Sequence, residues 1–272
     1  MIAVQTICTC QVESASRFQS KQRVPTLRCR TVLGIDLGTS NSCVSIIEQG
    51  QPRLLEICQE SPYIPSVVTF PKTGGPLIGK LTGVQDTSSS FSSFKRLIGR
   101  SFDEAHQDAQ SLGYTAREGP GGMLELFCPS QSSWLTPTYI TTSLLQHLIG
   151  AAASQKGSEV TGAVIGVPAR FSEAQCAATL QAVNAAGLHS VHLLREPIAA
   201  ALACGLQHQE SGAILVFDLG GGTFDLSLLE SFEGILEVLA TAGDTRLGGN
   251  NFDADIAKWI LQSSGLTEAN VR

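Results

Sequence analysis

The residues of this 272-residue chain best placed for ligand binding or catalysis are two aspartates. Each of them ends an apolar run, and each is followed by a turn of small and polar residues that contains glycine. Asp36 ends the run TVLGID and Asp218 ends AILVFD, and the turns LGTSN and LGGGT follow them directly. Glycine lets backbone N–H groups approach closely and converge on an anion. Mg²⁺ is usually held by one or two carboxylates together with waters and substrate phosphates. The pair of segments therefore predicts a polyphosphate and Mg²⁺ site between two facing turns.

The two segments repeat each other at an offset of 182 residues. Asp36 aligns with Asp218, and Glu48 aligns with Glu230. In each copy a second apolar run follows the turn, which predicts a β-hairpin. A repeat of this length suggests a duplicated lobe, and a chance similarity of two short hairpins is the alternative. A Walker-type loop is excluded, because it needs G-x-x-x-x-G-K-[ST] running into a helix and the chain has no such segment.

Strands and helices are expected to alternate between the two hairpins. Apolar residues at helical spacing predict a helix over Tyr139–Ser154, and Ala163–Val167 is expected to be a buried strand. Ser172, with a glutamine three residues on, fits a capping box. Val191–Leu194 should be another strand, and Pro197 stands near the start of the next helix. This alternation predicts an α/β fold with covered sheets.

The overall composition is that of an ordinary soluble globular protein, with 43% hydrophobic and 15% charged residues. The formal net charge of −6 argues against a nucleic-acid-binding surface. No apolar run approaches the roughly 18 uncharged residues needed to span a bilayer, so no membrane partner is expected. The eight cysteines show neither zinc-finger spacing nor a dense disulfide framework.

The first 30 residues differ from the rest of the chain in charge. Residues 1–30 carry five lysines and arginines against one acid, Glu13, and contain several serines. This composition is typical of an organelle transit peptide, whereas the apolar core of a secretory signal is missing. We expect a transit peptide or a disordered leader here. Import into the plastid stroma is favoured, with the mitochondrion or the cytoplasm as alternatives.

Five motifs, in order along the chain, resemble those of the DnaK-type seventy-kilodalton heat-shock chaperones. The resemblance covers most of residues 31–262. The motifs are GIDLGTSNS (34–42), FKRLIGR (94–100), REP followed by AAALACGL (195–206), FDLGGGTFD (217–225) and GDTRLGGNNFD (243–253). The resemblance implies an actin-like ATPase fold, of class α/β, with duplicated ribonuclease-H-like lobes. Residues 31–212 would form the first lobe of a nucleotide-binding domain. Residues 213–272 would begin a second lobe that is truncated and therefore incomplete.

The resemblance implies ATP or ADP, Mg²⁺ and K⁺ as the cofactors of this site. Asp36 and Asp218 would hold Mg²⁺, partly through water. Asp225 would bind a monovalent cation such as K⁺, although an ordinary polar position on a strand is the alternative. The nucleotide would be bound by the residues Gly38, Thr39, Ser40, Asn41, Gly220, Gly221, Gly222, Thr223 and Gly249.

Four residues would carry the catalysis that the resemblance implies. Lys95 would stabilise charge on the transferred phosphoryl group, and a solvated basic turn is the alternative. Glu196 would act near the metal and the attacking water, although it could simply complement a helix N-terminus. Asp218 and Thr223 would complete this group. Such hydrolysis relies mostly on positioning and electrostatic stabilisation.

The sequence departs from the family pattern at several positions. Ile198 stands where threonine is usual, and Arg170 and Cys176 stand where tyrosine and arginine are usual. Asn251 replaces an acidic residue. We therefore expect weakened coupling between nucleotide state and any distant domain. The chain also stops before the family's adenine clamp, the rest of the second lobe and the peptide-binding domain, so an uncovered apolar face is expected in the second lobe.

The leading functional interpretation is the ATP-binding and ATP-hydrolysing module of a molecular chaperone that assists protein folding. The resemblance implies a J-domain co-chaperone and a nucleotide-exchange factor as partners, and unfolded client proteins only through a C-terminal domain that this chain lacks. A non-catalytic truncated remnant or interaction module is one alternative. An actin-fold metabolite kinase is another, against which the motifs FKRLIGR and LGGNNFD argue.

Overall fold

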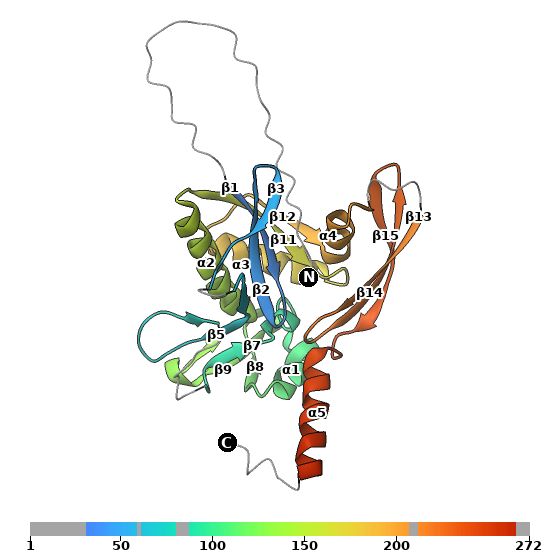
Figure 1. Ribbon diagram of the computed structural model, residues 1–272. Coiled ribbons are helices and arrows are strands. Elements are labelled where there is room, and N and C mark those ends of the chain that lie inside the picture. Colours follow the sequence, from blue (N-terminus) through green and yellow to red (C-terminus); the bar gives the residue numbers. More distant parts are fainter. Residues whose placement is uncertain (1–30, 59–60, 80–86, 207–211, 265–272) are drawn as a thin grey trace, which may run out of the picture.

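The computed structural model describes residues 31–58, 61–79, 87–206 and 212–264 (Figure 1). The expected leader, residues 1–30, lies outside the described residues. None of the described helices combines the length and the hydropathy needed to cross a membrane.

A six-stranded mixed sheet forms the centre of the first lobe. Five of its strands lie in the order β12-β11-β1-β2-β3, and β4 pairs with β2. The strands β1, β11 and β12 are parallel, whereas β2 runs antiparallel to β1, β3 and β4. Leu33 and Ile35 of β1 are completely buried, as expected for an inner strand. The strand bounds are β1 Thr31–Leu37, β2 Asn41–Glu48, β3 Gln51–Leu54, β4 Tyr63–Pro65, β11 Val160–Val167 and β12 Val191–Arg195.

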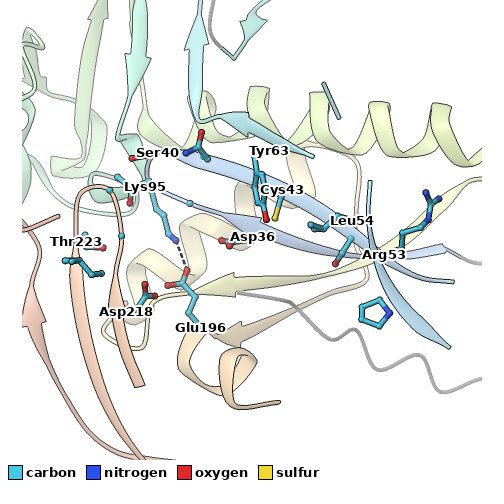
Figure 2. Close-up of a pocket in the computed structure, with 18 residues that line it drawn as sticks. Asp36, Ser40, Cys43, Arg53, Leu54, Tyr63, Lys95, Glu196, Asp218 and Thr223 are labelled. Atoms are coloured by element: carbon cyan, nitrogen blue, oxygen red, sulfur yellow. Dashed lines mark hydrogen bonds and ion pairs between the residues drawn. The ribbon is translucent and has the colours of Figure 1, made fainter. Parts of the chain in front are cut away.

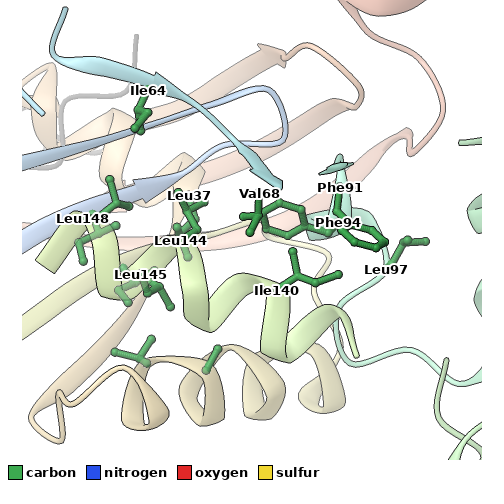
Figure 3. Close-up of a cluster of buried hydrophobic side chains, with 14 of the residues drawn as sticks. Leu37, Ile64, Val68, Phe91, Phe94, Leu97, Ile140, Leu144, Leu145 and Leu148 are labelled. Carbon is green, nitrogen blue, oxygen red and sulfur yellow. The ribbon is translucent and has the colours of Figure 1, made fainter. Parts of the chain in front are cut away.

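Helix α2 (Pro137–Lys156) crosses the central sheet and packs side by side with α3 (Glu173–Ala185) (Figure 1). Leu144 and Leu148 of α2 are buried against the sheet (Figure 3). The expected capping box is confirmed, because the Ser172 hydroxyl accepts from the Gln175 N–H and the Gln175 side chain accepts from the Ser172 N–H. These contacts fix where α3 begins.

Two small sheets and one helix extend the first lobe beside α2. The first sheet has the order β6-β5-β7 and the second has the order β10-β9-β8. Phe91, Phe94 and Leu97 are buried at their junction with α2 (Figure 3). Phe94 and Leu97 flank Lys95, so their burial fixes the short 3₁₀ turn Phe94–Arg96 that carries it. The bounds are β5 Val67–Thr69, β6 Leu77–Ile78, β7 Ser90–Ser92, α1 Phe102–Ser111, β8 Ala116–Glu118, β9 Leu124–Cys128 and β10 Ser133–Leu135, with further 3₁₀ turns at Pro120–Gly122 and Pro129–Gln131.

Over residues 212–264, the second lobe consists of an antiparallel sheet and one helix. Its strands are β13 (Gly212–Leu219), β14 (Phe224–Phe232) and β15 (Ile235–Asp244), in that order, and α5 covers Gly249–Ser264. Helix α4 (Glu196–Ala203) lies between this sheet and the central sheet (Figure 1).

The repeat predicted from the sequence is confirmed by the hairpin registers. In the first hairpin Asp36 pairs with Cys43, and in the second Asp218 pairs with Asp225, at the same offset of 182 residues. A third antiparallel strand, β3 or β15, then extends each hairpin. The two lobes therefore present the same aspartate and the same turn.

The second lobe exposes large apolar side chains both on its sheet and on α5. Leu215 and Phe217 of β13 are 64% and 66% exposed, and Trp259 of α5 is 67% exposed. By contrast, Leu229 of β14 is completely buried. The uncovered apolar face expected from the sequence is therefore present.

Candidate functional site

A cleft of about 680 Å³ lies where the turns of the two repeated hairpins meet (Figure 2). One wall comes from β1, β2 and the turn between them, and the opposite wall comes from the turn between β13 and β14. Lys95 and Glu196 lie deep between these walls, with their charged ends pointing toward each other (Figure 2). The two copies of the repeat thus build one site together.

The two glycine turns approach so closely that side chains do not fit. A Cβ atom added at Gly221 would lie 2.0 Å from the Ser40 Oγ atom of the other turn. Within the first turn itself, a Cβ atom added at Gly38 would lie 2.1 Å from the Asn41 carbonyl oxygen. Both distances are far below van der Waals contact, so these positions require glycine for space. The same absence of side chains leaves the backbone of both turns accessible to a ligand in the cleft.

Hydrogen bonds from outside the cleft hold each turn in place. Ser66 donates from its hydroxyl to the Gly38 carbonyl oxygen at 2.7 Å and from its N–H to the Ser40 carbonyl oxygen at 2.8 Å. In the second turn, the Gly249 N–H donates to the Gly220 carbonyl oxygen at 2.9 Å. Gly249 therefore supports the turn from behind.

Lys95 and Glu196 form a buried ion pair. The Lys95 Nζ atom lies 2.7 Å from Glu196 Oε1, and the two side chains are 14% and 10% exposed. Glu196 is the first residue of α4 and directly follows β12, while Lys95 comes from the fixed turn after Phe94. Burial acts to lower the pKa of Lys95, but the charges of Glu196 and Asp36 outweigh it and raise that pKa, so Lys95 stays charged.

Two further carboxyl groups share the cleft with this pair. Burial raises the pKa of Asp36 to about 6, with smaller contributions from Glu196 and Asp218 against the opposing charge of Lys95. Burial and the charge of Glu196 also raise the pKa of Asp218. Three carboxylates and one ammonium would carry a net charge of −2, which a divalent cation would balance.

Within the described ranges, no group of three or more His, Cys, Asp and Glu side chains is placed to hold a metal ion alone. Asp36 and Asp218 on facing walls nevertheless fit Mg²⁺, because this ion takes most of its ligands from water and substrate phosphates. The donor set therefore suits a metal that arrives with a polyphosphate.

Most residues predicted from the sequence line this cleft, and three do not. Gly222 packs against the first turn, where an added Cβ atom would come within 3.1 Å of Thr39 Cγ2. Asp225 lines a smaller adjoining cavity of about 160 Å³, and Gly249 supports the second turn. The predicted residues that line the cleft are Asp36, Gly38, Thr39, Ser40, Asn41, Lys95, Glu196, Asp218, Gly220, Gly221 and Thr223.

Seven lining residues were not predicted as site residues, and one of them, Leu219, lies between Asp218 and the second glycine turn. Cys43 and Ser45 follow Asn41 in steps of two along β2, so they share its face, and this alternation could have revealed them. The remaining four come from or adjoin β3 and β4, where no local pattern points to the cleft: Pro52, Arg53, Leu54 and Tyr63. Burial, with the charge of Asp36, raises the pKa of the Cys43 thiol to about 12, which excludes it as a nucleophile at neutral pH.

An ionic bridge joins the two lobes beside the cleft. Asp108 of α1 accepts from Arg100 Nη1 at 2.8 Å with one oxygen and from Arg246 Nε at 2.8 Å with the other. Arg246 follows β15, so this bridge links the first lobe to the second. Burial acts against the ionised form, but the hydrogen bond and charge of Arg100, together with Arg246, hold the pKa of Asp108 below its usual value.

Comparison with known proteins gives one consistent family. The family model described as Hsp70 protein matches residues 32–269. The chain is 42% identical over 235 residues to the chaperone protein dnaK of Cyanidioschyzon merolae, and covers 39% of that protein. It is 43% identical over 234 residues to the chaperone protein DnaK 1 of a Synechococcus species, and covers 31% of it. Each match involves 85% of this chain, which thus spans less than two fifths of these relatives.

Proposed function

Because the chain belongs to the Hsp70 family and has an actin-like α/β fold, we propose that it is the ATP-binding and ATP-hydrolysing module of a molecular chaperone. One observation carries the proposal. Two repeated Asp-Leu-Gly turns face each other across a cleft that contains a buried Lys–Glu pair. Such a cleft suits a polyphosphate bound together with Mg²⁺.

In this proposal the two turns bind the phosphates of ATP or ADP. Backbone N–H groups around Gly38 and Gly221 approach the phosphate oxygens without steric obstruction. The hydroxyls of Thr39 and Thr223 line the cleft from opposite walls and can donate to the same anion. Asp36 and Asp218 would hold Mg²⁺, which supplies positive charge that offsets the phosphate charge.

The buried pair would serve the hydrolytic step. Lys95 directs its ammonium into the cleft, where it can donate to the phosphoryl group that is transferred. Glu196 holds Lys95 with Oε1, and its remaining lone pairs can orient the attacking water. The water oxygen would form a bond to the γ-phosphorus as the bond to the bridging oxygen breaks. ADP leaves with the electrons of that bond, the phosphoryl group becomes inorganic phosphate, and a proton of the water is released to solvent. Fixed charges that need no rearrangement stabilise such a transition state.

Several finer assignments belong to the same proposal. Asp225, beside the cleft, would bind a monovalent cation such as K⁺. Residues 31–212 and 213–272 would be the first lobe and the start of the second. A J-domain co-chaperone, a nucleotide-exchange factor and client proteins would act on the whole chaperone. Relatives from a cyanobacterium and an alga support import of the protein into a plastid, directed by residues 1–30.

Calorimetry with ATP and Mg²⁺ tests the proposal on the chain as it stands. We expect a dissociation constant in the micromolar range or below, and Asp218→Asn should lower hydrolysis more than tenfold. Asp255→Asn on the exposed side of α5 makes the same charge change away from the cleft and should alter neither quantity. Undetectable binding would refute the nucleotide-binding role of this chain, and binding without hydrolysis would identify a non-catalytic module. Normal turnover in Asp218→Asn would refute the metal role of that residue.

A further inference from the structure

A second cavity, of about 160 Å³, shares a wall with the nucleotide cleft. Thr39, Lys95 and Thr223 line both spaces, so the two are separated only by side chains that would contact the terminal phosphate. The volume is more than ten times the roughly 10–15 Å³ that a single water requires. The cavity can therefore hold a small polyatomic ion together with water.

The lining of this cavity is cationic. Lys95, Arg96, Arg100 and Arg170 line it, against the two acids Asp108 and Asp225. Asp108 is already engaged by Arg100 and by Arg246. Lys95 is engaged by Glu196 from the cleft side. The excess of positive charge favours the binding of an anion in this space.

Arg96 is the residue that points most directly to a ligand. Its Nε atom is buried and has no hydrogen-bond partner in the part of the chain that the structure describes. Burial lowers the pKa of its guanidinium, and the neighbouring charges of Arg246 and Arg100 add to this, whereas Asp108 opposes it. A buried donor without an acceptor is costly, and native proteins rarely leave one. Arg96 lines the cavity, so an anion bound there would add acceptors close to this guanidinium.

Arg96 also lies at the boundary between the two spaces. A Cβ atom added at Gly222 would come within 3.1 Å of Thr39 Cγ2 and 3.9 Å of Arg96 Nη1. The guanidinium therefore stands directly behind the second glycine turn. A group that left the cleft past Thr39 would pass close to it.

We propose that this cavity is a binding site for inorganic phosphate, in which Arg96 and Arg170 receive the phosphate as it leaves the cleft after hydrolysis. The inference rests on the proposed function, because hydrolysis of ATP by water produces the phosphate together with ADP. Guanidinium groups suit this ligand, since their paired N–H donors match two phosphate oxygens. A monovalent cation at Asp225 would reduce the repulsion between that carboxylate and the phosphate.

The test is a calorimetric titration of inorganic phosphate into the full chain saturated with ADP and Mg²⁺, so that the nucleotide cleft is filled. We expect Arg96→Gln to weaken phosphate binding at least tenfold and Arg170→Gln to weaken it several-fold. ADP affinity should change less than twofold in both variants. Arg117→Gln makes the same charge change on a half-exposed arginine elsewhere and should leave phosphate binding unaltered.

A second variant and a titration of the ligand-free chain complete the experiment. Arg170 is exposed, so Arg170→Gln carries the test if Arg96→Gln does not fold. If the chain binds no ADP, the proposed function fails, and the phosphate titration is repeated on the ligand-free chain. In either setting, phosphate binding that depends on Arg96 and Arg170 supports the inference. Phosphate affinity equal to that of the unmodified chain in both variants overturns it.

Discussion

Replacing Lys95 by methionine should destabilise the ligand-free protein by about 3 kcal/mol. Removing one partner of a buried ion pair costs about 3–5 kcal/mol, because the other charge remains buried without compensation. The Lys95 and Glu196 side chains are 14% and 10% exposed, which places the expected loss at the lower end. Glu196 would then face Asp36 and Asp218, whose charges already interact unfavourably with it.

The matched double variant separates this electrostatic cause from a loss of packing. Lys95→Met with Glu196→Gln removes both charges, and replacement of a whole buried pair is often close to neutral. We expect Glu196→Gln alone to cost about 1 kcal/mol, because Lys95 keeps Asp36 and Asp218 as counter-charges, and the double variant to lie within about 1 kcal/mol of the unmodified protein. The coupling energy between the two changes is then about 3 kcal/mol.

Urea unfolding followed by circular dichroism at pH 7, without nucleotide, measures all three variants. The electrostatic reasoning fails if Lys95→Met costs less than about 1 kcal/mol. It fails equally if the double variant loses the sum of the two single losses, because Lys95 would then contribute packing alone.

Three further predictions follow from the cleft and its supports. Asp108→Asn should cost about 2 kcal/mol at pH 7, measured by urea unfolding, because charge-assisted hydrogen bonds are lost. The pKa of Asp108 is lowered in the folded state, so its contribution is complete above the unfolded value of about 3.9 and disappears as pH falls through the lower folded pKa. Gly221→Ala should abolish ATP binding in calorimetry, because the added Cβ atom would overlap Ser40 of the facing turn. The control Gly150→Ala, on α2 where the added atom meets open space, should instead raise the free energy of unfolding by about 1 kcal/mol. Iodoacetamide at pH 8 should modify the exposed Cys204 and leave Cys43 unmodified until urea unfolds the chain, as measured by mass spectrometry. Equal labelling of the two cysteines in the native state would contradict the raised pKa of Cys43.

The parts of the fold that could be predicted from the sequence are those determined by local chemistry. The Ser172 capping box needs only a serine and a glutamine three residues apart, and it begins α3 as expected. The two hairpins were predictable because turn residues follow Asp36 and Asp218 at the same spacing, and their registers match. Local patterns of this kind depend on neighbours within a few residues, so the sequence contains them in full.

The parts that could not be predicted depend on contacts between distant segments. Tyr63 and Arg53 line the cleft only because β3 and β4 both pair with β2, and no pattern around either residue indicates that pairing. The bridge from Arg246 to Asp108 spans 138 residues and likewise has no local signal. Asp225 is a different case. Its position after the second turn indicates that it lies on β14, but the sequence does not indicate that it lines the adjoining cavity and not the cleft.

The repeat itself explains why the site lies between the lobes. Each hairpin alone supplies one carboxylate and one turn whose backbone is accessible, which is too little to hold a metal and a polyphosphate together. Contact between Gly221 and Ser40 brings the two turns within one ligand's reach, and this contact exists only while both lobes hold their relative positions. The Asp108 bridge and α4 both connect the lobes, so they set the width of the cleft. It follows that changes at Asp108 or along α4 beyond Glu196 should alter nucleotide affinity although these residues do not line the cleft, whereas equal changes on the exposed face of α5 should not.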